Sequence, residues 1–257
     1  MMNKYVGSVL RRTILAAAMS TLAIVPLSAQ RGRGQAGAPA NPRAAAPVDL
    51  TGYWVSVVTE DWRYRMITPK KGDFPSVPLN ADGRQVANAW DPARDEAAGD
   101  QCKAYGAGGV MRVPGRLHIA WQDDTTLKVD LEAGTQTRLL KFGGAVSATP
   151  GWQGDSTAEW EIAGGRRGRA ATGGDLKVVT RNMRPGYLQK NGVPYGAGAV
   201  LTEYFARTIE PNGDSWLIVT AIVEDAQYLT GRFVRSTHYK RLPDTSTAWE
   251  PEPCSAR

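Results

Sequence analysis

Residues 200–225 read VLTEYFARTIEPNGDSWLIVTAIVED. Two runs rich in Val, Ile, Thr, Tyr and Phe flank the tetrapeptide Pro211-Asn212-Gly213-Asp214. Asn-Gly between two such runs is the strongest short-range signal of a β-hairpin, because both residues tolerate the positive φ angles of its tight turn. We therefore predict two antiparallel strands here, over residues 200–210 and 215–225.

Further runs on both sides of this hairpin alternate apolar and polar residues or are rich in β-branched residues. They cover residues 53–59, 116–122, 126–131, 135–142, 158–162, 175–184 and 233–242. Short connections rich in Gly, Asp and Asn join most of them, and no helical pattern alternates with the strands after residue 116. Strands connected in this way pair antiparallel. Since closure removes exposed edges, we predict an all-β fold, an antiparallel up-and-down barrel of about 8–9 strands.

Residues 62–114 interrupt this scheme after the first strand. Residues 80–90 read NADGRQVANAW, which predicts a short helix with Asn80 as its N-cap, and a second helical turn is expected within residues 92–105. Excursions of this length are uncommon in compact β domains and often form lids or sites. We expect a partly helical insert that caps one end of the barrel.

The first thirty residues have the three parts of a secretory signal peptide. Lys4, Arg11 and Arg12 precede an apolar run over residues 13–27, and Ser28-Ala29-Gln30 follows as the expected cleavage site. The run is too short for a membrane span, which needs about 20 apolar residues. We predict a periplasmic or secreted protein without a membrane span after cleavage. The Arg pair leaves open whether export uses an ordinary or a twin-arginine signal.

Residues 31–46 read RGRGQAGAPANPRAAA, a composition that cannot bury enough apolar surface to fold. We predict a disordered tether here and a single β-barrel domain over residues 47–257. The formal net charge is +6, but six basic residues and no acidic ones precede residue 47, so the predicted domain is close to neutral. This balance argues against a nucleic-acid partner, whose phosphates require a basic surface.

The chain has two cysteines, Cys102 and Cys254. An even pair in an oxidising compartment predicts one disulfide. It would join the C-terminal tail to the insert and close a loop long enough to stabilise the fold by about 4–5 kcal/mol in the chain-entropy description. Two free buried thiols are the alternative.

Gly52-Tyr53-Trp54 opens the first predicted strand. A Gly-X-Trp at this place resembles the start of the lipocalins. The resemblance implies a calycin-like barrel in which Trp54 closes one end and packs against an Arg of a late strand, here Arg235 or Arg241. The insert and the lack of a predicted C-terminal helix are departures from the lipocalin pattern.

The whole predicted domain is also similar to a family of exported bacterial proteins with no established activity. The resemblance is carried by DLTGYWVSVVTEDWRYRM at 49–66, VPLNADGR at 77–84, WDPARDEAAGDQCKAYGA at 90–107, MRVPGRLHIAW at 111–121 and IVTAIVEDAQYLTGRFVRSTHYKR at 218–241. It implies one secreted domain and no particular chemistry.

The chain has only two histidines and none of the common metal, phosphate or dinucleotide motifs, so we expect neither a metal site nor a cofactor. Candidate acid–base residues are therefore His238, His118 and Glu203. Alternation places Glu203 on one face with Leu201 and Phe205, so we expect an inward carboxylate in an apolar cavity. Each histidine can equally be a surface or hydrogen-bonded residue.

Aromatic and Arg side chains complete the candidate site, because they suit a planar or amphipathic small molecule at a barrel mouth. The candidate ligand-binding residues are Trp62, Arg65, Arg112, Trp121, Tyr204 and Tyr239. Core aromatics and surface Arg are the alternative interpretation of the same residues.

Three functions remain open at this point. The first is an exported protein that binds a small, mostly apolar ligand in the barrel cavity. The second is a cofactor-independent lyase, isomerase or hydrolase that uses acid–base chemistry in the same cavity. The third is an interaction module of the cell envelope. A cavity lined almost only by apolar side chains favours the first, a His and a carboxylate within hydrogen-bond reach in a closed cavity favour the second, and a large exposed apolar patch favours the third.

Overall fold

The structure is a computed structural model of the 257-residue chain, and it describes residues 41–144, 146–162, 173–243 and 249–257. The predicted signal peptide and residues 31–40 of the predicted tether lie outside the described residues. Residues 41–46 form a turn against the barrel, where the Trp160 indole donates a hydrogen bond to the Pro42 carbonyl (2.9 Å). This part of the predicted tether is therefore in contact with the fold.

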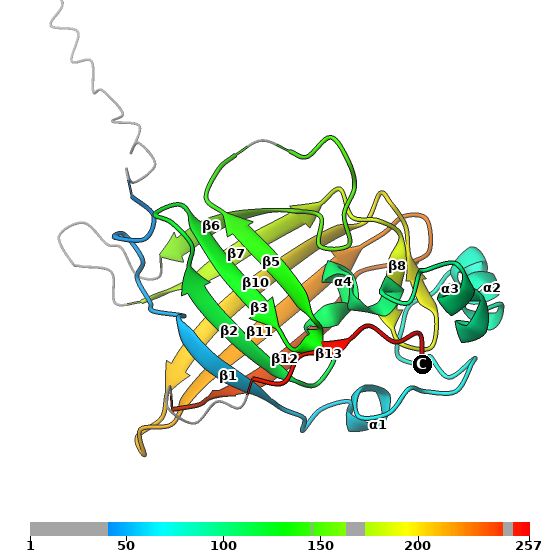
Figure 1. The fold of residues 1–257 in the computed structure, drawn as a ribbon, viewed down its shortest axis with the longest axis horizontal. Coiled ribbons are helices and arrows are strands. Elements are labelled where there is room, and N and C mark those ends of the chain that lie inside the picture. Colours follow the sequence, from blue (N-terminus) through cyan, green and yellow to red (C-terminus); the bar gives the residue numbers. More distant parts are fainter. Residues whose placement is uncertain (1–40, 145, 163–172, 244–248) are drawn as a thin grey trace, which may run out of the picture. The chain divides into compact units, whose positions relative to one another are not determined.

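Nine strands of the described chain close into a barrel, and all nine coincide with predicted strands. They are β1 (Gly52–Val57), β2 (Arg116–Trp121), β3 (Thr126–Leu131), β5 (Gln136–Lys141), β6 (Asp155–Ile162), β7 (Gly174–Arg181), β10 (Val200–Ile209), β11 (Ser215–Glu224) and β12 (Phe233–Arg241). Figure 1 shows them wrapped around one interior. The predicted all-β, calycin-like barrel is confirmed.

The remaining elements lie outside the barrel wall. They are α1 (Trp62–Arg65), α2 (Ala81–Asn88), α3 (Pro92–Ala97), the 3-10 helix η1 (Lys103–Tyr105), α4 (Ala107–Val110), β4 (Ala133–Gly134), β8 (Gly186–Gln189), β9 (Val193–Tyr195) and β13 (Glu252–Pro253). No helix among the described residues is both long and apolar enough to span a bilayer.

The strand pairing is mixed, which corrects the expected all-antiparallel meander. Every neighbouring pair in the barrel is antiparallel except β5 and β6, which run parallel. A closed barrel with an odd number of strands must contain at least one parallel pair. Here the loop after β5 returns to the insert, where the Ala107 amide donates to the Trp152 carbonyl (2.9 Å), so β6 starts at the same end of the barrel as β5.

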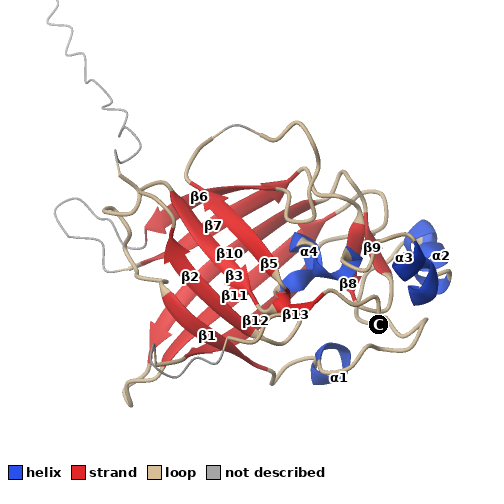
Figure 2. Ribbon diagram, in the orientation of Figure 1, coloured by secondary structure: helices blue, strands red, loops and turns tan. Residues whose placement is uncertain are grey.

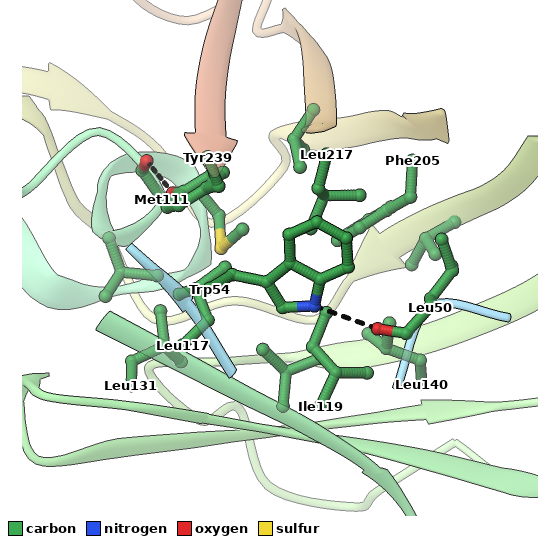
Figure 3. Close-up of a cluster of buried hydrophobic side chains, with 14 of the residues drawn as sticks. Leu50, Trp54, Met111, Leu117, Ile119, Leu131, Leu140, Phe205, Leu217 and Tyr239 are labelled. Carbon is green, nitrogen blue, oxygen red and sulfur yellow. Dashed lines mark hydrogen bonds between the residues drawn. The ribbon is translucent and has the colours of Figure 1, made fainter. Parts of the chain in front are cut away.

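The interior is filled by side chains from all nine strands. Trp54 is fully buried among aliphatic residues, and its indole nitrogen donates a hydrogen bond to the Leu50 carbonyl (3.0 Å; Figure 3). The guanidinium groups of Arg207 and Arg241 each lie 5.9 Å from the centre of the Trp54 ring. Arg241, and not Arg235, is thus the late-strand Arg that approaches this Trp.

The partly helical insert after β1 is confirmed, and it covers one end of the barrel, which we call the cap end. Figure 2 shows the helices gathered at this end. Tyr239 on β12 donates a hydrogen bond to the Met111 carbonyl just after α4 (2.5 Å). Asn80 is the N-cap of α2, as predicted, and accepts a hydrogen bond from the Gly83 amide (2.8 Å).

The predicted disulfide between Cys102 and Cys254 is present. It links the start of η1 to the C-terminal tail just after β13, and β13 pairs with β4 beside the cap end. The tail is therefore fixed across the edge of the barrel close to the insert.

Candidate functional site

Glu203 faces the barrel interior as predicted, but the expected apolar cavity is absent around it. Its carboxylate accepts hydrogen bonds from Nη1 and Nη2 of Arg138 at 2.9 and 2.5 Å, and both side chains are at most 1% exposed. Nη2 of Arg138 also lies 3.4 Å from the Thr180 hydroxyl. The small cavity lined in part by Glu203 has a volume of about 10 Å³, which holds no more than one water molecule.

The structure does not bring His238, Glu203 and His118 together. Strand alternation places Thr237 and Tyr239 in the interior, so His238 lies on the outer wall of the barrel. His118 also lies on the outer wall, where its ring stacks on Tyr53 at 4.2 Å between centroids. The proposed partners of His238 in acid–base chemistry are therefore separated from it by the wall or by other strands.

His238 instead pairs with Glu60, which follows β1. Its Nδ1 lies 3.0 Å from a carboxylate oxygen of Glu60. Burial raises the pKa of the Glu60 carboxyl, but a backbone hydrogen bond and the nearby charge of Arg65 outweigh this effect, so the pKa lies below its usual value. When Nδ1 donates to this carboxylate, Nε2 becomes the basic nitrogen.

The His238 ring lines a hollow of about 300 Å³ on the outer wall. Val57, Trp216 and Ile218 supply most of its apolar lining. We call this feature the wall hollow. A carboxylate-oriented histidine beside an apolar surface has the arrangement required of a general base, although the hollow is open to solvent.

Two acidic residues connect the first strand to three arginines at the cap end. Asp61 has a left-handed backbone conformation (φ 50°, ψ 28°), which Asp tolerates better than most residues, and it turns the chain from β1 into α1. Glu60 forms an ion pair with Arg65. Asp61 forms ion pairs with Arg112 and Arg235, both at 3.1 Å. The three guanidinium groups thus converge on two carboxylates.

Arg65 and Arg112 are buried within this cluster. Arg65 donates a hydrogen bond from Nε to the Arg112 carbonyl (2.9 Å), which fixes one Arg relative to the other. Burial lowers the pKa of the Arg112 guanidinium, Asp61 opposes this shift, and the charges of Arg65 and Arg235 add to it. The net pKa lies below the usual value. Three guanidinium groups face two carboxylates, so the cluster has an excess of positive charge.

A hollow with a volume of about 440 Å³ lies at the rim of the cap end. We call it the rim groove. It is bounded by the outer face of β1, the segment after α1, the segment before β2, and the C-terminal tail. Its apolar lining comes from Val55, Met66, Ile67, Tyr105, Val113 and Pro114. Met66 and Ile67 are about 60% exposed (59% and 65%), an unusual exposure for side chains of this type.

A smaller cavity of about 20 Å³ adjoins the rim groove, and we call it the inner pocket. The two hollows share Arg65, Val113 and Lys190 as lining residues. Arg112 and Gln189 also line the inner pocket. A polar cavity thus lies beside a larger and partly apolar groove.

Two of the six predicted ligand-binding residues, Arg65 and Arg112, meet at the inner pocket. Tyr239 is buried in the interior near them, and burial raises the pKa of its phenol. Trp62 on α1 is 63% exposed and lies next to the segment that borders the rim groove.

The other two predicted ligand-binding residues lie elsewhere. Trp121 packs on Phe142 at 5.7 Å between ring centroids, at the end of the barrel opposite the cap. Tyr204 lies on the outer face of β10, opposite Lys177 and Thr220 of the neighbouring strands. The structure thus divides the predicted set between the cap end and other parts of the barrel.

Gln189 and Lys190 were not predicted as site residues. They belong to the hairpin of β8 and β9, which the sequence analysis did not identify. Asn191-Gly192 within this hairpin is the same dipeptide signal that predicted the hairpin at 200–225, and Gly192 has the positive φ (82°) that such a turn requires. The signal was therefore available in the sequence.

Comparison of the chain with models of known protein families, with curated proteins and with solved structures finds no match. Within the described ranges, no group of three or more His, Cys, Asp and Glu side chains is arranged to hold a metal ion. The features of the described chain that can hold a small molecule are the rim groove, the inner pocket and the wall hollow.

Proposed function

We propose that this is an exported protein that binds a small, mostly apolar ligand, and that the ligand lies in the rim groove. The observation that carries the proposal is the contrast between the filled barrel interior and the 440 Å³ groove at its rim. This volume is within the range of about 300–1,000 Å³ that is typical of small-molecule sites. Its lining combines apolar side chains with the charged side chains of Arg65, Arg116, Glu132, Lys190, Glu250 and Glu252.

Export is supported by the predicted signal peptide and by the disulfide between Cys102 and Cys254. Disulfides persist in oxidising compartments such as the periplasm and the extracellular space. A periplasmic or secreted location is therefore part of the proposal.

Two matched substitutions on β1 test the binding site. Val55 and Val57 both face outward, but Val55 lines the rim groove and Val57 lines the wall hollow. Trp is well accommodated in strands, so Val55→Trp and Val57→Trp should each fill one hollow without disturbing the core. Each variant is then the control for the other.

The experiment incubates the purified protein with a complex extract of small molecules and identifies bound and free compounds by mass spectrometry. We expect at least one compound to be retained unchanged by the natural chain and by Val57→Trp, and lost from Val55→Trp. Retention that is insensitive to Val55→Trp would show that the rim groove is not the site.

An acid–base enzyme is the second candidate, and the His238–Glu60 contact at 3.0 Å beside the wall hollow favours it. In the same experiment this function would consume a compound and release a product. The change should be lost in His238→Ala and Val57→Trp and kept in Val55→Trp. Neither retention nor turnover would leave the cell-envelope interaction module as the best interpretation, with the exposed Trp62, Met66 and Ile67 as its contact surface.

A further inference from the structure

We propose that the ligand of the rim groove is a monocarboxylate whose carboxylate enters the inner pocket between Arg65, Arg112, Gln189 and Lys190. This inference rests on the proposed function, since it names the chemical class of the ligand that the rim groove binds. It adds a specific anchoring site, which the apolar lining of the groove alone does not provide.

Buried polar atoms without partners surround the inner pocket. Nη2 of Arg65, Nη1 of Arg112 and both side-chain amide atoms of Gln189 are buried and have no hydrogen-bond partner among the described residues. The three side chains are at least 92% buried, with exposed fractions of 4%, 8% and 6%. Buried polar groups are normally satisfied, because leaving one unpaired is costly. Nη2 of Arg65, Nη1 of Arg112 and Nε2 of Gln189 are donors, so these three nitrogens at one cavity point to a missing acceptor.

The charged side chains that line the inner pocket are all positive. Arg65, Arg112 and Lys190 line the inner pocket, and no carboxylate is among its described lining residues. Glu60 and Asp61 pair with other nitrogens of the two guanidinium groups and leave Nη2 of Arg65 and Nη1 of Arg112 unused. Lys190 makes no ion pair within the described chain and lies 5.6 Å from the Tyr105 ring centroid. The pocket therefore favours an anionic acceptor over a cation.

The volume of the inner pocket suits a carboxylate group. About 20 Å³ accommodates roughly one or two water-sized atoms, which matches the oxygens of a carboxylate better than the four oxygens of a phosphate. Guanidinium groups also match the planar geometry of a carboxylate. Val113 lines both the inner pocket and the rim groove, and Met66 and Ile67 of the groove can contact an apolar body.

Carboxylates in the lining of the rim groove favour a ligand with one negative charge. Glu250 and Glu252 of the C-terminal tail line the groove and are exposed, and neither lines the inner pocket. A second carboxylate on a ligand would approach these like charges, which is unfavourable. A single carboxylate joined to an uncharged apolar body avoids this repulsion.

The test measures binding to the purified full chain by isothermal titration calorimetry with five probes of equal chain length: decanoate, decanol, decylamine, decyl phosphate and decanedioate. We expect decanoate to bind at least about 10-fold more tightly than the other four, because it alone can form charge-assisted hydrogen bonds with the inner pocket through a single carboxylate.

Gln189→Met and Lys190→Met remove polar groups that make no internal hydrogen bond or ion pair among the described residues, so both should fold normally. Each should reduce the preference for decanoate over decanol about 10-fold or more, with decanol affinity unchanged. Lys141→Met, at the opposite end of the barrel, is the control and should change neither affinity.

Each other outcome contradicts a specific part of the inference or of the proposed function. Equal binding of decanoate and decanol means that the inner pocket holds only solvent, which overturns the inference and leaves the proposed function intact. If decyl phosphate, decylamine or decanedioate binds more tightly than decanoate, the inference that the ligand is a monocarboxylate is wrong. If no probe binds while the extract yields a compound that Val55→Trp displaces, the inference alone is wrong. If no probe binds and Val55→Trp affects nothing, the proposed function is wrong as well.

Discussion

The buried ion pair between Arg138 and Glu203 predicts a large and strongly non-additive effect on stability. The two side chains are 1% and 0% exposed and share two hydrogen bonds. Glu203→Gln removes one charge and leaves the Arg138 guanidinium uncompensated in the barrel interior. Breaking a buried pair in this way costs about 3–5 kcal/mol, whereas replacing both partners by apolar residues is often neutral or stabilising. A loss of this size is a substantial part of the total stability of about 5–15 kcal/mol that is typical of a folded protein.

The assay is a double-mutant cycle in urea, followed by tryptophan fluorescence with the disulfide intact. Glu203→Leu and Arg138→Met should each lower the free energy of unfolding by about 3–5 kcal/mol, which is a fall of about 10 °C in the melting temperature of a domain of this size. The double variant Arg138→Met/Glu203→Leu should regain most of that loss. Lys177→Met, which removes the exposed ion pair with Glu159, is the control and should have little effect.

Additive losses in the double variant would refute the reasoning, because they would mean that Arg138 and Glu203 contribute independently. Losses below about 1 kcal/mol in both single variants would also refute it, since that is the range of exposed pairs. The same variants bear on chemistry. If Glu203 were an acid–base residue, Glu203→Gln would abolish turnover of a compound with little effect on stability.

Three further predictions concern the tail, a turn and the first strand. Cys254→Ser should lower the free energy of unfolding by about 2–5 kcal/mol relative to the natural chain in urea titrations without reductant, because only the natural chain keeps the long loop closed; an unchanged midpoint would contradict this. Gly134→Ala should be more destabilising in the same titration than Gly213→Ala, because both glycines have positive φ (69° and 87°) but only at Gly134 would a Cβ collide with the Tyr105 ring, at 2.5 Å. Glu60 has a lowered pKa in the folded protein, so its stabilising effect is present above the unfolded value near 4.5 and is lost as the pH falls through the folded value. The stability difference from Glu60→Gln should thus be constant above about pH 5.5 and shrink below about pH 4.5, and a difference that grows on acidification would contradict it.

Strand positions could be predicted well because each depends on its own residues. Leu201, Glu203 and Phe205 alternate with polar or smaller residues, and all three face inward. Alternation alone does not say which face of a strand is the inner one. His238 shares one face of β12 with Val234 and Ser236, whereas the row that faces inward contains Thr237 and Tyr239. Packing against the neighbouring strands and the cap determines which face is the inner one.

The partners of inward polar residues could not be predicted, because they depend on the order and stagger of distant strands. Arg138 and Glu203 are 65 residues apart and lie on β5 and β10, which are not neighbours in the barrel. The expected meander also contained no parallel pair. The parallel pairing of β5 and β6 could not be predicted, because the path of the loop after β5 is set by its contact with the insert rather than by local composition.

The candidate site could be predicted only in part for a similar reason. Arg65 and Arg112 lie near the two ends of the insert, and together with the candidate aromatic residues they predicted a site for a planar or amphipathic small molecule at a barrel mouth. The rim groove, however, also needs the tail and the β8–β9 hairpin, which approach the insert only in the folded chain. The disulfide prediction contained part of this information, because it placed the tail beside the insert.

The filled interior and the rim groove are two results of the same insert. Residues 104–111 close the cap end and extend the core of the barrel, so side chains and a buried ion pair occupy the space in which a ligand was first expected. The same insert projects α1 and the segment after it past the barrel wall, where the tail forms the opposite side of the groove. If binding depends on this rim, ligand affinity should be independent of the core. Arg138→Met/Glu203→Leu then tests location as well as stability, because a ligand in the interior would lose affinity in this variant, whereas a ligand in the rim groove would keep it.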